Sequence, residues 1–249
     1  MKRSTLLLLI LVATAVALAA TWAMLNRGGT GNAVTSEDLP AFSRVTVDGA
    51  ATLVLVQGPA EHIAVEASPR SARVRAHVDN DGTLVITSGD HQRWWRSLVS
   101  GPARTPTVTL TFRTLQSLRG NGAVKIVAER LTVPRLGIVL NGAGAVRIAA
   151  IEAEELTVSG SGAIKAEIAG RVGTQKIAMA GAGVYRAADL HSDNASVSVS
   201  GAGKAVINAS KTLDVDISGA GSVEYLGNPK LTEQVSGAGK IRRRDATAA

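Results

Sequence analysis

Residues 196–207 read SVSVSGAGKAVI: serine alternates with valine, the chain passes Gly-Ala-Gly, and a second apolar run begins. Alternation with period two is typical of a strand that buries one of its faces. Glycine directly after such a strand permits a positive φ angle and a close approach of two backbones. The stretch therefore predicts a strand, a sharp Gly-x-Gly corner and a second strand.

The same phrase recurs throughout the second half of the chain. Gly-x-Gly occurs seven times, and the first glycines are 22, 18, 21, 20, 18 and 18 residues apart. A regular period near 20 residues is typical of a solenoid, in which successive coils stack on one another. The predicted structural corners are Gly120 and Gly122, Gly142 and Gly144, Gly160 and Gly162, Gly181 and Gly183, Gly201 and Gly203, Gly219 and Gly221, and Gly237 and Gly239.

The residues before the corners support this interpretation. Two positions before each first glycine stand only apolar residues: Leu118, Leu140, Val158, Met179, Val199, Ile217 and Val235. We therefore expect an all-β fold, namely a single-stranded parallel β-helix of coils of about 20 residues, with an N-terminal antiparallel strand-rich segment.

Five stretches make up the predicted organisation. Residues 1–25 combine Met1-Lys2-Arg3 with a long apolar run, which predicts a signal peptide, with residues 1–19 cleaved, or an uncleaved N-terminal membrane anchor. The remaining stretches are a flexible linker (26–41), an antiparallel β segment packing on the solenoid and lacking Gly-x-Gly corners (42–118), the coils (119–241) and a charged C-terminal tail (242–249). We therefore expect an exported protein whose remaining chain lies outside the cytoplasm.

Composition narrows the possible functions. The chain has no cysteine, which excludes disulfides, thiolate metal sites and a cysteine nucleophile. Its net charge is +7, which favours anionic partners. Nucleic acid is not expected, because the export signal opposes it and no helical reading motif is present. The Gly-x-Gly copies lack the third glycine and the following helix that a phosphate-binding loop needs.

No catalytic site, metal site or cofactor is predicted. The four histidines lack metal-ligand spacing, and the acidic residues are scattered, with Asp214 and Asp216 most simply read as a solvated strand face. Two alternatives stay open at this point. One is a carbohydrate-active β-helix enzyme whose site assembles from distant coils, and the other is a purely structural envelope protein.

A column of cations is the first candidate for recognition. Five residues after the first glycine of the first four corners stand Lys125, Arg147, Lys165 and Arg186. If the coils stack, these four side chains form a basic column that suits an anionic polysaccharide or lipid head groups. The alternative is that their long stems cover apolar sheet surface while nearby glutamates neutralise the charge.

The segment HQRWWRSL, residues 91–98, is the second candidate. Arg93, Trp94, Trp95 and Arg96 lie in a predicted loop, and tryptophan beside arginine is the composition of interface hot spots. The tryptophan rings suit stacking on sugars or seating at a membrane surface. The alternative is that one ring folds back over the end of the solenoid.

The apolar N-terminus, the strand-rich lead and the repeated SGAG corners together resemble a bacterial family described as "putative auto-transporter adhesin, head GIN domain". The resemblance covers roughly residues 42–240. It implies a single-stranded parallel β-helix with additional strands and a cell-surface or adhesive role. Together with the export signal, it leads us to expect a location in the periplasm, in the outer envelope or at the cell surface of a bacterium. It assigns no catalytic residue to this sequence.

Overall fold

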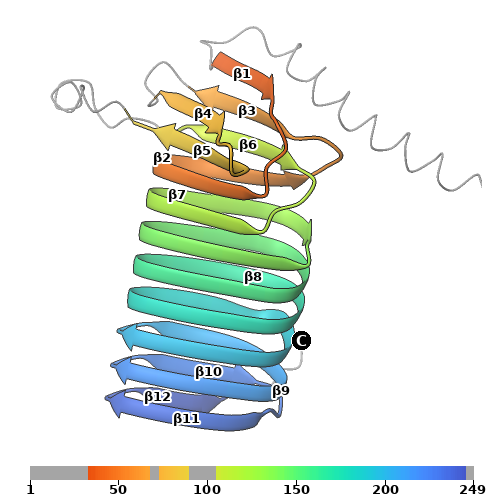
Figure 1. Ribbon diagram of the computed structural model, residues 1–249. Helices are drawn as coiled ribbons and strands as arrows, with labels where there is room; N and C mark the ends of the chain where they lie inside the picture. Colours follow the sequence, from red (N-terminus) through yellow and green to blue (C-terminus); the bar gives the residue numbers. More distant parts are fainter. Residues whose placement is uncertain (1–32, 68–72, 90–104, 245–249) are drawn as a thin grey trace, which may run out of the picture.

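The computed structural model describes residues 33–67, 73–89 and 105–244. Within them, twelve strands form one sheet whose pairings are partly parallel and partly antiparallel (Figure 1). The predicted all-β class is therefore confirmed. The strands are β1 (Ala33–Asp38), β2 (Arg44–Gln57), β3 (His62–Ala67), β4 (Val74–Val78), β5 (Thr83–Ser88), β6 (Thr107–Phe112), β7 (Ser117–Thr132), β8 (Arg135–Gly201), β9 (Lys204–Gly219), β10 (Ser222–Leu226), β11 (Lys230–Gly237) and β12 (Lys240–Arg243).

The predicted signal peptide or anchor at residues 1–25 lies outside the described residues, as do the first residues of the linker up to 32. Across the described part of the chain, no helix has the length and apolar character needed to cross a bilayer.

From β7 onward the chain forms coils that pair in parallel with one another (Figure 1). Gly122 of β7 faces Gly142 of β8, and Gly201 of β8 faces Gly219 of β9. The first part of β9, from Lys204 to Asn208, pairs in parallel with β10, and its last part, from Thr212 to Gly219, pairs in parallel with β11. Neighbouring coils are therefore about 4.8 Å apart, the spacing of hydrogen-bonded strands.

A single column of glycines marks the corner of every coil. These glycines share a φ angle between 104° and 125° and lie one above another: Gly49, Gly122, Gly142, Gly162, Gly181, Gly201, Gly219 and Gly237. From Gly122 onward they are 20, 20, 19, 20, 18 and 18 residues apart. The expected alignment on the first glycine was wrong in two copies, because in 120–122 and 160–162 the second glycine is the corner.

The other glycine of each motif occupies an inward position, where the absence of a Cβ leaves room for a large neighbouring side chain. A Cβ at Gly144 would lie 2.8 Å from Cδ1 of Leu140, and a Cβ at Gly160 would lie 2.8 Å from Cγ1 of Ile164. Each of the seven coils with a Gly-x-Gly motif thus has one glycine and one large apolar residue on the two sides of its corner. In chain order these pairs are Gly120/Val124, Leu140/Gly144, Gly160/Ile164, Met179/Gly183, Val199/Gly203, Ile217/Gly221 and Val235/Gly239.

The N-terminal segment differs from the expected antiparallel arrangement over residues 42–118. β2 is itself a coil of the stack: it pairs in parallel with β7, and its Gly49 faces Gly122. β2 also pairs in parallel with β5 and β6, whereas only the outer pairs β1–β3, β3–β6 and β4–β5 are antiparallel. The physical reason is that period-two alternation is the same in both orientations, whereas the connections decide the direction.

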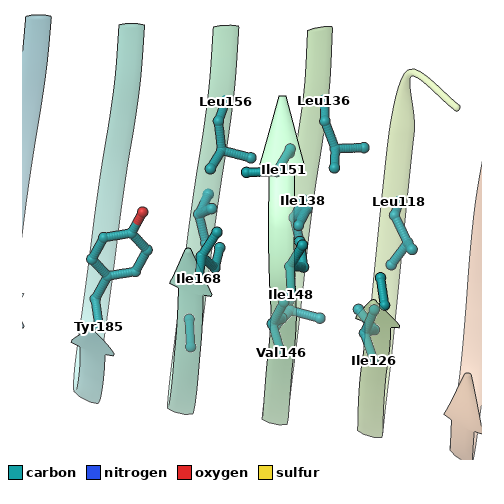
Figure 2. Packing of buried hydrophobic residues seen from close by; sticks show 14 of the residues in the cluster. Leu118, Ile126, Leu136, Ile138, Val146, Ile148, Ile151, Leu156, Ile168 and Tyr185 are labelled. Atoms are coloured by element: carbon teal, nitrogen blue, oxygen red, sulfur yellow. The ribbon is translucent and has the colours of Figure 1, made fainter. Parts of the chain in front are cut away.

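Aliphatic side chains fill the interior between the strands of each coil. Leu118 and Ile126 of β7 and Ile138 and Ile148 of the next coil are at most 1% exposed and belong to the row of buried side chains in Figure 2. Tyr185 adds an aromatic ring to this row and is equally buried. A core of such narrow side chains suits a thin section repeated many times.

A buried polar cluster lies beside Tyr185. The Tyr185 hydroxyl donates to Oε1 of Gln175 at 3.2 Å, and Nε2 of Gln175 donates to Oγ of Ser192 at 2.7 Å. Oγ of Ser192 in turn donates to the carbonyl oxygen of Asn208 at 2.7 Å. Burial raises the pKa of Tyr185 far above its ordinary value, so the phenol stays a hydrogen-bond donor.

Candidate binding face

The outward residues of the strand that follows each corner form a regular surface, which we call the basic face. It consists of the first, third and fifth residues after each corner glycine. The first position is alanine in every coil, and all of these alanines except Ala50 are exposed: Ala50, Ala123, Ala143, Ala163, Ala182, Ala202, Ala220 and Ala238. They form a flat, uncharged row along the stack.

Lysine occupies the third position in every second coil. Lys125 faces Ala145, Lys204 faces Ser222, and Ser222 faces Lys240, while Lys165 lies at the same position in the coil between Ala145 and Val184. All four lysines are exposed. Because coils are about 4.8 Å apart, the lysines recur at about 9.6 Å along the stack.

The fifth position alternates in sign. Arg147, Glu167 and Arg186 follow one another in adjacent coils, and Glu224 faces Arg242 nearer the C-terminus. The predicted single column of Lys125, Arg147, Lys165 and Arg186 is therefore wrong as geometry, because Val127 rather than Lys125 faces Arg147. The cause is again the second-glycine corner at Gly122 and Gly162, which moves both lysines to the third position.

This separation removes direct repulsion between like charges, which destabilises cross-strand neighbours. Oε1 of Glu167 forms ion pairs with Nζ of Lys165 at 3.1 Å and with the guanidinium group of Arg186 at 2.9 Å. The hydrogen bond from Lys165 is the main reason why the pKa of Glu167 lies below its ordinary value. Thus Lys165 and Arg186 are partly neutralised, as one of the sequence interpretations anticipated.

Other cations of the basic face have no such partner. Within the described ranges, Lys125, Arg147 and Lys240 form no ion pair. Lys204 contacts Glu224 at 2.6 Å, and Arg242 faces the same carboxylate. The hydrogen bond from Lys204 is the main cause that lowers the pKa of Glu224. The third and fifth positions together carry seven cations and two carboxylates, so this face is strongly positive.

The strand before each corner presents a different surface. Its outward residues are mostly small and uncharged, and Ser159, Ser161, Ala178, Ser198 and Ser200 line a shallow depression of about 280 Å³. Asp214 and Asp216 are exposed on this same face, as expected for a solvated strand. The positive charge is therefore concentrated on the side that follows the corners.

A groove of about 660 Å³ follows the return bends of several coils. Glu152, Glu154, Arg171, His191 and Asp193 line it together with apolar and small polar residues. Lys211 contacts Asp193 at 2.9 Å, and this hydrogen bond lowers the pKa of the carboxyl group. Such lowering is typical of an ion-paired surface, whereas a general acid needs a raised pKa.

No group of three or more histidine or carboxylate side chains able to hold a metal ion occurs in the residues that the structure describes. The second predicted site, Arg93, Trp94, Trp95 and Arg96, lies outside those residues. Sequence reasoning missed Lys204, Lys240 and the alanine row. Alignment of the copies on the glycine followed directly by alanine would have found all three.

Solved structures share this fold at low sequence identity. A structure described as a putative adhesin from Bacteroides fragilis has a TM-score of 0.76 and 19% identity, covering 87% of this chain and 98% of that one. A putative adhesin from Parabacteroides merdae gives 0.64 and 16%, and a putative lipid binding protein from Parabacteroides distasonis gives 0.63 and 20%; each comparison covers 87% of this chain and 98% of the other.

A search of curated proteins finds no match to this sequence. The family described as "Putative auto-transporter adhesin, head GIN domain" matches residues 41–229, which is most of the chain and all but the last coil of the stack. This agrees with the resemblance drawn from the corners. The chain belongs to this adhesin-like family.

Proposed function

We propose that this chain is an exported, non-catalytic scaffold whose stacked coils form a single-stranded parallel β-helix, and that its basic face binds a linear anionic polymer of the cell envelope. The observation that carries the proposal is the lysine at every second coil beside a continuous row of alanines. The family description as an adhesin supports a role at the cell surface, and the apolar start of the sequence supports export.

The spacing indicates the kind of polymer. Lysines about 9.6 Å apart match a charge that recurs once in two units of an extended sugar chain. The flat alanine row lets such a chain lie along the stack without steric obstruction, and the lysine stems are long enough to reach its acid groups. Six coil steps from Gly122 to Gly237 give a contact length of about 29 Å.

A binding measurement with the full chain tests this proposal. The probes are a polymer with one carboxylate in each disaccharide, such as hyaluronate, a neutral dextran, and vesicles with or without anionic lipid. We expect salt-sensitive binding to the anionic polymer and none to dextran. Stronger binding to anionic vesicles than to the polymer would reassign the face to lipid head groups.

A matched pair of variants separates the face from overall charge. The double variant K165A/K204A removes two ion-paired lysines from the basic face, whereas K176A/K211A removes two ion-paired lysines elsewhere. We expect about a tenfold loss of affinity for the first and less than about twofold for the second. Equal losses would contradict a specific face. A W94A/W95A variant tests the tryptophan segment in the same assay.

A further inference from the structure

The stack ends at β11 and β12 with sheet edges that have a partner on one side only. β11 pairs with β9, and β12 pairs with β10, and no other strand of the described ranges pairs with either. The outer backbone N–H and C=O groups of these strands are thus available for pairing. An unpaired edge of this kind is a template for strand addition.

The apolar interior is also uncovered at this end. Leu213 and Ile217 of β9 are fully buried. Val235 of β11 faces Ile217 and continues its column, but it is 43% exposed. Leu231 and Ile241 are only partly buried, although they continue the columns of Leu213 and Val223. A further strand with apolar residues over Leu231, Val235 and Ile241 would bury these side chains as in the preceding coils. A polar residue of that strand would lie over Glu233, which faces the buried Val215 in the same inward row.

Charge at this end selects among possible partners. Lys230, Lys240, Arg242, Arg243 and Arg244 lie at this end, where Glu233 is the one carboxylate of β11 and β12 and Glu224 of the preceding coil faces Arg242. Two such ends brought together would place five cations opposite five, which disfavours pairing with a second copy. The same cations attract a strand whose outward residues are acidic, so such a strand is favoured as the partner.

We propose that the C-terminal end of the stack is an acceptor for an extended acidic segment of another polypeptide, with apolar residues at alternate positions. The added strand pairs with the outer edges of β11 and β12, its apolar residues cover Val235 and Ile241, and its carboxylates contact Lys240 and Arg242, which share the outward face of β12. Lys240 and Arg242 also belong to the basic face, so the two proposals share these residues, but strand addition at the end of the stack does not depend on polymer binding.

Hydrogen exchange of the full chain with a synthetic peptide tests the proposal. The peptide has the length and inward residues of β7, which passes through its corner in the same order as β11 followed by β12. It has glutamine at the inward position over Glu233 and glutamate at its outward positions. One control peptide has the same composition in shuffled order, and another has lysine in place of glutamate. We expect saturable protection of β11 and β12 amides, with exchange slowed about tenfold or more, and no change in β7. Neither control peptide should protect these amides.

A second pair of variants tests the charge. K240E/R242E should weaken peptide binding about tenfold or more, whereas R171E/K211E, with the same change in charge at the return bends, should leave it unchanged. Absence of protection overturns the proposal, as does equal protection by the lysine peptide. Protection that grows with protein concentration alone would identify a second copy as the occupant. Protection without peptide that is lost in a variant ending at Arg244 would identify the chain's own residues 245–249.

Discussion

Gly142→Ala tests the physical basis of the corner column. Gly142 has a φ angle of 110°, and a Cβ there would lie 2.7 Å from the carbonyl oxygen of Gly122 in the coil before it, against 3.4 Å for ordinary contact. The positive φ angle costs about 1–2 kcal/mol for a residue with a Cβ. The overlap of about 0.7 Å with a backbone oxygen adds about 1–3 kcal/mol, comparable to overpacking a core. We expect the free energy of unfolding to fall by about 2–5 kcal/mol.

Gly82→Ala is the matched control. Gly82 also has a positive φ angle, 74°, but nothing lies within 4 Å of the position that its Cβ would take. Its replacement should cost only the conformational part, about 1–2 kcal/mol. Urea unfolding followed by circular dichroism measures both values, provided that the slope of each transition equals that of the unchanged chain. Equal losses for the two variants would refute the claim that close stacking, rather than backbone angle alone, requires glycine at the corners.

Three further outcomes are expected. Tyr185→Phe should lower the free energy of unfolding by about 1–2 kcal/mol, because the Gln175 amide oxygen loses its donor. Because the pKa of the tyrosine is raised in the folded state, its contribution is complete below about pH 10 and declines progressively as the pH rises from there toward the folded pKa. Alkaline unfolding should therefore be less steep in the variant. Gly144→Ala should lower the free energy of unfolding through overlap of the new Cβ with Leu140. The double variant with Leu140→Val should lose less free energy of unfolding than the two single variants lose in sum, and a double-mutant cycle in urea measures this difference. Glu167→Gln should strengthen polymer binding about two- to fivefold and increase its salt dependence, because Lys165 and Arg186 lose their neutralising partner; unchanged affinity would indicate that these cations do not contact the polymer.

The strand content and the repeat could be predicted from the sequence because both depend on local patterns. Alternation shows which face of a strand is buried, and recurring glycines show where the chain turns. The orientation of β2 could not be predicted in this way. Its alternating residues suit either direction, and Gly49 stands 73 residues before the next corner without a second glycine beside it.

The candidate face was predicted in composition but not in arrangement. A Gly-x-Gly motif contains one corner glycine and one inward glycine, and their order reverses between Leu140/Gly144 and Gly160/Ile164. A displacement of two residues keeps inward positions inward, so the apolar columns looked correct under either alignment. Only the outward charges distinguished the two alignments, and these depend on which coil lies beside which.

Two repeat lengths coexist on the basic face: alanine recurs with every coil and lysine with every second one. Duplication of a single coil would therefore lengthen the stack and keep the alanine row, yet it would shift every later lysine out of phase with the earlier ones. Duplication of two coils would preserve both rows. If the lysine period matters to a ligand, members of different length should differ by even numbers of coils, so growth of the molecule would be coupled to the chemical period of what it binds.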